Sequence, residues 1–108
     1  MKEKFLGEFE QMLLLSIFKL GADAYGTKVR QLLADSIKRD ISVGALYTTL
    51  ERLEKKGLVS SKMGEATAER GGRAKKYFQV TASGQSALRK SKDALTTLWQ
   101  GLALRVSA

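Results

Sequence analysis

The chain has 108 residues, with 19 Lys and Arg against 11 Asp and Glu, a formal net charge of +8, and no histidine, cysteine or proline. This length suits one domain, or one domain with a long flanking helix, and a hydrophobic share of 44% is typical of a folded globular chain. Because the commonest general base, thiolate nucleophiles and the usual transition-metal ligands are missing, we expect no enzyme, no metal site and no cofactor.

The charge and the terminal segments indicate where such a protein works. No apolar run approaches the roughly 20 residues of a membrane span, and the first ten residues contain no secretory apolar region. We therefore expect a cytoplasmic protein without a membrane partner. The positive balance favours a polyanionic partner, with nucleic acid ahead of a membrane surface.

The first segment predicts a helix that is apolar on nearly every side and that ends at Gly21. Steps of three and four give it a core-facing stripe of Leu6, Phe9, Met12, Leu13, Ile17 and Leu20. Leu14, Leu15 and Phe18 lie off this stripe, so the helix needs more cover than a small core provides. Two explanations for these extra apolar residues remain open: the helix is buried at the centre of the domain, or a second subunit covers its other side.

Two more helices follow. The spacing of Val29, Leu32, Leu33 and Ile37 predicts a helix over residues 24–37, and Ile41 in the next connector is a candidate for a single strand-like pairing. Ser42 is a good N-cap for a third helix over residues 43–56, which ends at Gly57. Its core-facing positions are Val43, Leu46, Leu50 and Leu53.

The rest of the chain predicts two short strands and one long helix. Residues 58–63 and 75–80 are rich in strand formers, and the loop over residues 64–74 joins them into a hairpin. A last helix over residues 82–106, capped by Thr81 or Ser83, has a seam of Leu88, Leu95, Leu98, Trp99 and Leu102. The fold class is therefore mostly α with a small β-hairpin, in the order of a winged helix-turn-helix with a long C-terminal helix. Such a fold places its third helix in the DNA major groove and its hairpin, the wing, along the backbone or minor groove.

Polar and basic residues gather where this fold would meet DNA. The third helix turns Gly44, Thr48, Arg52 and Lys55 away from the core. Thr48 could contact a thymine methyl or a phosphate, Arg52 a guanine or a phosphate, and Tyr47 either reaches a phosphate or packs between helices. Arg70, Arg73, Lys75 and Lys76 lie within seven residues without an acid among them, which suits phosphates but also suits an ordinary solvated loop.

These segments resemble the PadR family of transcriptional regulators. Residues 24–29 resemble the Tyr-Gly motif that opens the family's second helix. Residues 41–59 look like its signature of a small residue followed by Leu-Tyr, then Leu, Arg-Leu-Glu and Gly-Leu. Residues 72–84 are similar to its wing and to the start of its last helix. The likeness covers roughly residues 8–90, in order and at the family's spacing.

The resemblance implies a homodimeric repressor that binds an inverted-repeat operator in double-stranded DNA, with residues 1–81 as the winged-helix DNA-binding domain and residues 82–108 as the dimerisation helix. It also implies release by a small planar apolar effector, with Trp99 in a comparable place. The implied DNA-binding residues are Tyr25, Thr27, Lys28, Ser42, Ala45, Tyr47, Thr48, Arg52, Arg73, Lys75 and Lys76. The expected dimer interface contains Leu14, Phe18, Leu95, Leu98, Trp99 and Leu102.

Other readings remain open. A winged helix can also serve as a protein-interaction module, or as an architectural DNA binder without effector control. Glu51 and Glu54 are three residues apart on the predicted third helix, but without histidine or cysteine we interpret them as ordinary solvated carboxylates and not as an acid–base pair.

Overall fold

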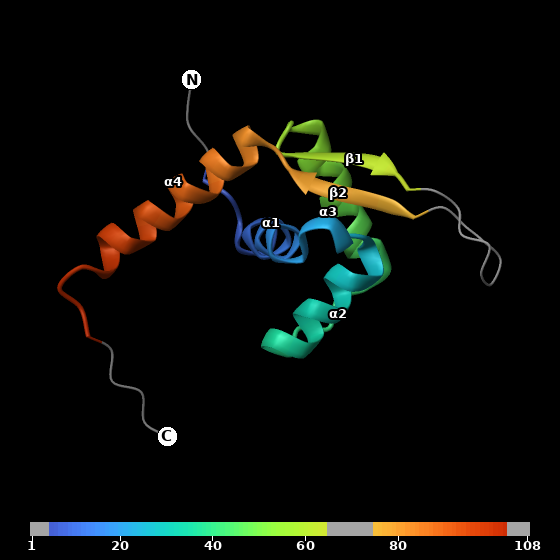
Figure 1. The fold of residues 1–108 in the computed structure, drawn as a ribbon. Helices are drawn as coiled ribbons and strands as arrows, with labels where there is room; N and C mark the ends of the chain where they lie inside the picture. Colours follow the sequence, from blue (N-terminus) through green and yellow to red (C-terminus); the bar gives the residue numbers. More distant parts are fainter. Residues whose placement is uncertain (1–4, 65–74, 104–108) are drawn as a thin grey trace.

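The computed structural model describes residues 5–64 and 75–103 (Figure 1). In chain order the elements are α1 (Glu8–Leu20), a 3₁₀ turn (Gly21–Asp23), α2 (Gly26–Ile37), α3 (Val43–Lys55), β1 (Val59–Met63), β2 (Lys76–Val80) and α4 (Ala82–Trp99). The predicted class, mostly α with one hairpin and a long last helix, is confirmed. In Figure 1, α4 extends from the base of the hairpin to one side of the molecule, and the far ends of β1 and β2 point to the other. No described helix has the length and apolar character needed to span a membrane.

The core forms around α1, which contacts α2, α3, β2 and α4. Its fully or nearly fully buried members include Leu13, Leu14, Ile17, Val29, Leu33, Leu46, Leu50, Leu53, Val59, Phe78 and Val80. The burial of Leu14 at 0% exposure corrects the prediction that it lies off the core-facing stripe, and it leaves no surface of this side chain for a partner subunit. Val43 is 51% exposed at the first position of α3, so its predicted place in the core is also wrong.

Two hydroxyl caps fix the starts of α3 and α4. The Ser42 hydroxyl accepts a hydrogen bond from the backbone N–H of Ala45 at 3.1 Å, as predicted. Of the two candidates for α4, Thr81 is the cap, because its hydroxyl accepts from the Gly84 N–H at 3.0 Å and donates to the Gly57 carbonyl at 2.7 Å. One side chain therefore joins the end of the α3 segment to the start of α4.

The chain before α2 is extended and pairs with the wing, the hairpin of β1 and β2. Tyr25 forms an isolated antiparallel bridge with Tyr77, and the Phe78 N–H donates to the Ala24 carbonyl at 2.8 Å. α2 consequently begins at Gly26, two residues later than predicted. The strand-like pairing predicted at Ile41 is wrong, since its carbonyl instead accepts from Arg30 Nε at 2.8 Å.

The last helix is shorter than predicted. α4 ends at Trp99, and residues 100–103 are not helical, whereas the prediction extended it to Val106. Gly101 has φ +78°, a left-handed conformation that glycine adopts without strain and that stops a helix. Residues 104–106 lie outside the described part of the chain.

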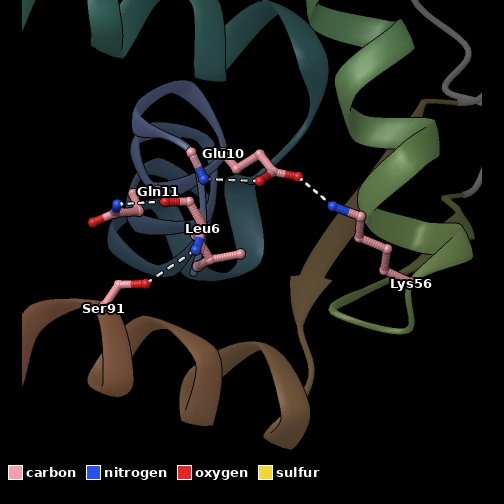
Figure 2. A network of polar contacts seen from close by, with 6 residues as sticks. Leu6, Glu10, Gln11, Lys56 and Ser91 are labelled. Carbon is pink, nitrogen blue, oxygen red and sulfur yellow. Dashed lines mark hydrogen bonds and ion pairs between the residues drawn. The ribbon is translucent and has the colours of Figure 1, made fainter. Parts of the chain in front are cut away.

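The segment before α1 contacts the last helix, and the first turn of α1 contacts the residue just past α3 (Figure 2). The Leu6 N–H donates to the Ser91 hydroxyl on α4 at 3.3 Å. One oxygen of Glu10 accepts from the Gly7 N–H at 2.9 Å, and the other pairs with Lys56 Nζ at 2.9 Å, just past α3. Burial is the largest influence on the pKa of Glu10 and would raise it, but the hydrogen bonds from Lys56 and Gly7 and the charges of Lys56 and Arg52 together hold the pKa below its ordinary value.

Candidate nucleic-acid interface

The outer face of α3 is small, hydroxylated and basic. With Leu46, Leu50 and Leu53 buried, the residues left exposed on α3 include Gly44, Ala45, Thr48, Glu51, Arg52 and Lys55. Lys55 and Glu51 form an i,i+4 ion pair at 3.6 Å with both side chains at least 70% exposed, which is worth only about 0.3–0.5 kcal/mol. The face can therefore rearrange its charges at little cost when a polyanion approaches.

Tyr47 lies on the flank of α3, between this outer face and α2. Tyr47 is 43% exposed, and its hydroxyl stands against the Cα of Gly26, where an added Cβ would overlap the hydroxyl and the ring carbon that carries it. Packing and solvent access thus coexist at this residue. The Gly26 of the Tyr-Gly motif is needed because any larger residue would push this ring outward.

The start of α2 presents a second polar surface. Thr27 and Lys28 are exposed in the first turn, where the free backbone N–H groups of a helix favour a phosphate. Tyr25 is half-buried, and its ring meets the Tyr77 ring edge-on at 5.5 Å between centroids. Lys75 Nζ stands 4.1 Å from the centroid of the Tyr25 ring, so the start of β2 and the start of α2 form one surface.

Three basic residues of the wing lie in the described structure: Lys62 is exposed on β1, and Lys75 and Lys76, at the start of β2, have different surroundings. Lys75 contacts the Tyr25 ring, whereas Lys76 Nζ lies 3.6 Å from a carboxylate oxygen of Glu54 on α3. The other oxygen of Glu54 accepts a hydrogen bond from the Ser61 hydroxyl at 2.6 Å. Arg70 and Arg73, expected at the tip of the wing, lie outside the described residues.

An apolar surface lies away from α3, along α1 and α4. Its members are exposed by half or more, and they are Leu15, Phe18, Leu95, Leu98, Trp99 and Leu102. A hollow of about 510 Å³ between the two helices is lined in part by Leu15, Phe18, Leu95 and Trp99. Five of the six expected interface residues therefore lie exposed on or beside this surface, namely Phe18, Leu95, Leu98, Trp99 and Leu102, and Leu14 does not.

Sequence reasoning did not find two carboxylates that organise these surfaces. The sequence predicts a solvated acid at Glu54, as at Glu51, but the Glu54 side chain is only 35% exposed and contacts both strands of the wing. Glu10 is 12% exposed and anchors Lys56. In Glu10 a signal existed, since an acid three residues after Gly7 at a helix start is typical of a capping contact.

The fold and the exposed face of its third helix define the class, a winged helix-turn-helix of the kind used by DNA-binding regulators. A profile of the PadR-like family of transcriptional regulators matches residues 14–90, and the chain belongs to that family. It is accordingly a transcriptional regulator and not an enzyme. A search of curated proteins gave no significant match.

Solved structures of the same family have the same fold. A PadR-like transcription factor from Bacteroides fragilis is 26% identical, with a TM-score of 0.70, over 83% of this chain and 82% of that one. A PadR family regulator from Eggerthella lenta is 28% identical, with a TM-score of 0.66, over 87% and 81%. A PadR family regulator from Clostridium difficile, at 24% identity and a TM-score of 0.62 over 83% and 90%, supports the fold alone.

Proposed function

We propose that the chain acts as a homodimeric repressor in the cytoplasm, in which α3 of each subunit enters a major groove of an inverted-repeat operator. The observation that carries this proposal is the outer face of α3, which exposes Thr48 and Arg52 beside a capped helix start at Ser42. Among the described residues the Arg52 side chain makes no ion pair or hydrogen bond, so its donors stay available to a base or a phosphate. The start of α2 and the wing would hold the backbone on either side.

The apolar surface on α1 and α4 supports the dimer. Phe18, Leu95, Leu98 and Trp99 are each 50–72% exposed, and such a cluster of large apolar side chains marks an interaction site in a soluble protein. A second copy of the same surface is the simplest cover, because symmetric dimers bury the same patch twice. Leu98, at 72% exposed, lies at its most open point, so Leu98→Glu should produce monomers in light scattering with an unchanged circular dichroism spectrum.

The hollow beside Trp99 is our proposed effector site. Its volume of about 510 Å³ lies in the range of small-molecule pockets, and its apolar residues suit a planar aromatic compound. To regulate, the compound must bind the two DNA-binding states of the dimer with different affinities. Trp99 is the only tryptophan, so its fluorescence reports on this site alone. A panel of planar compounds that changes neither this fluorescence nor DNA affinity would remove the effector from the proposal.

The test of DNA recognition begins with a selection from random duplexes, followed by fluorescence anisotropy on the selected and a scrambled sequence at two salt concentrations. Arg52→Ala should lower affinity for the selected duplex by about tenfold and reduce its preference over the scrambled one. Lys19→Ala removes the same charge from an exposed position of α1, which carries none of the proposed DNA-binding residues, and serves as the control.

Each outcome has a defined meaning. Tight, salt-dependent binding that prefers the selected duplex supports the repressor. Equal binding to both duplexes would instead identify an architectural DNA binder. If no duplex binds at low salt, the DNA proposal is refuted and a protein-interaction module takes its place.

A further inference from the structure

Glu54 is an acid in a place where an acid opposes DNA binding. It lies in the last turn of α3, three residues after the exposed Glu51 and two after Arg52. A carboxylate here repels phosphate at short range, so its presence in a DNA-binding helix calls for a compensating role. Its contacts indicate what that role is.

Both oxygens of Glu54 are used, and each one holds a different strand. One oxygen accepts from the Ser61 hydroxyl of β1 at 2.6 Å, and the other stands 3.6 Å from Lys76 Nζ of β2. Ser61 lies opposite Phe78 in the hairpin register, and Lys76 lies opposite Met63, so the two attachments are two positions apart along the wing. A single side chain on α3 therefore restrains the wing at two points, and two points fix an angle where one does not.

The same flank of α3 is held at its other end. Tyr47 precedes Glu54 by seven residues, two helical turns, and its hydroxyl packs against Gly26 at the start of α2. The start of α2 is in turn tied to β2 by the Ala24–Phe78 hydrogen bond and the Tyr25–Tyr77 ring contact. Of the two attachments on this flank, only the one at Glu54 depends on charge.

We infer that Glu54 is a positioning residue that sets the angle of the wing against α3, and that operator preference depends on it through the Lys76 ion pair. The inference rests on the proposed DNA-binding function. It changes the role expected for Lys76: this side chain is drawn toward α3, and its charge is largely cancelled by Glu54 at 3.6 Å. Lys75, which carries no such acid partner among the described residues, is then a cation at the far end of β2 that faces a phosphate.

Glu51 provides a matched control. Glu51→Gln and Glu54→Gln remove the same charge from the same helix, three residues apart, but Glu51 pairs with Lys55 and does not contact the wing in the described structure. Both variants should bind scrambled DNA slightly better, by about two- to threefold, because a repelling charge is gone. Only Glu54→Gln should lose preference for the selected duplex, by about five- to tenfold.

A charge-neutral variant separates geometry from electrostatics. Glu54→Gln combined with Lys76→Met leaves the net charge unchanged and removes the ion pair, so affinity for scrambled DNA should stay within about twofold of the wild type. The ratio of affinities for the selected and scrambled duplexes should still fall as in Glu54→Gln. A wild-type ratio in this double variant, or equal effects of Glu51→Gln and Glu54→Gln, would overturn the inference.

A DNA-free measurement keeps the inference testable if the operator proposal fails. Amide hydrogen exchange over Ser60–Met63 and Lys76–Gln79 should become severalfold faster in Glu54→Gln and remain unchanged in Glu51→Gln. Gln can still accept from the Ser61 hydroxyl, so the fold is retained, and circular dichroism verifies this. Unchanged exchange in Glu54→Gln would refute the positioning role, whatever the DNA experiments show.

Discussion

The ion pair between Glu10 and Lys56 should contribute measurably to stability because one partner is largely out of water. The Glu10 side chain is 12% exposed and Lys56 is 46% exposed, with 2.9 Å between the charged atoms (Figure 2). Replacing Lys56 with Met would leave the Glu10 carboxylate with the Gly7 N–H as its remaining hydrogen-bond donor. Removing one partner of a fully buried ion pair lowers the free energy of unfolding by about 3–5 kcal/mol. Because Lys56 is partly exposed to water, we expect a loss of about 1–2 kcal/mol here.

Glu10→Gln should lower the free energy of unfolding by only about 1 kcal/mol, because the amide oxygen can still accept a hydrogen bond from the Gly7 N–H. The two changes should also be non-additive. Once Lys56 is absent, replacing Glu10 removes an unpaired charge instead of a partner, so the double variant should be more stable than the sum of the single effects predicts by about 1 kcal/mol.

The pH dependence has a definite sign. Because the pKa of Glu10 in the folded protein lies below its unfolded value of about 4.3, the folded state binds the proton less tightly. The contribution of the ion pair is therefore complete above that unfolded value, and it is lost as pH falls through the lower folded pKa. The stability difference between wild type and Glu10→Gln should be constant from pH 6 to 8 and should shrink below about pH 4.

Urea unfolding followed by circular dichroism, at one fixed protein concentration, measures these differences, because association of subunits would also shift the midpoint. Urea is preferable to guanidinium, whose ionic strength screens the pair. The reasoning is wrong if the free energy of unfolding of Lys56→Met lies within about 0.3 kcal/mol of the wild-type value at pH 7, and if this difference does not change when the pH is lowered.

Two glycine substitutions should act in different ways. In Gly84→Ala the new Cβ overlaps the Leu58 carbonyl and a Val80 methyl. Because the backbone at Leu58 cannot move aside, we expect the free energy of unfolding in urea to fall by about 1–3 kcal/mol, despite the better helix propensity of alanine. An unchanged urea midpoint would contradict this. In Gly26→Ala the new Cβ overlaps the hydroxyl end of the Tyr47 ring, which can move outward. The free energy of unfolding should therefore change by less than about 1 kcal/mol, while affinity for DNA should fall. Tyr47→Phe in the same chain should partly restore binding, and a failure to do so would argue against the clash.

The sequence was informative wherever a local rule decides the structure. Ser42 and Thr81 cap α3 and α4 because a hydroxyl beside free backbone N–H groups satisfies them locally. Gly57 has φ +76°, the conformation expected where α3 ends. The order of the elements followed from these signals and from apolar spacing.

Other features depend on contacts between distant residues, which spacing alone does not predict. Leu14 is buried because α1 is surrounded on several sides, and apolar periodicity predicts the direction of a side chain but not what covers it. The bridge between Tyr25 and Tyr77 is a single pair of residues and has no periodic pattern. The pairing of Glu54 with Lys76 joins residues 22 positions apart, so a solvated acid was the reasonable expectation for Glu54.

The bridge at Tyr25 also bears on how the duplex must fit the protein. The start of α2 and β2 are joined by the Ala24–Phe78 hydrogen bond and by the contact between the rings of Tyr25 and Tyr77. The distance between the two proposed phosphate-binding surfaces is therefore set by the fold, and a groove of another width must be widened or narrowed to match. Since the energy of such a deformation depends on base sequence, stiffness at base pairs that the protein never touches becomes part of operator choice.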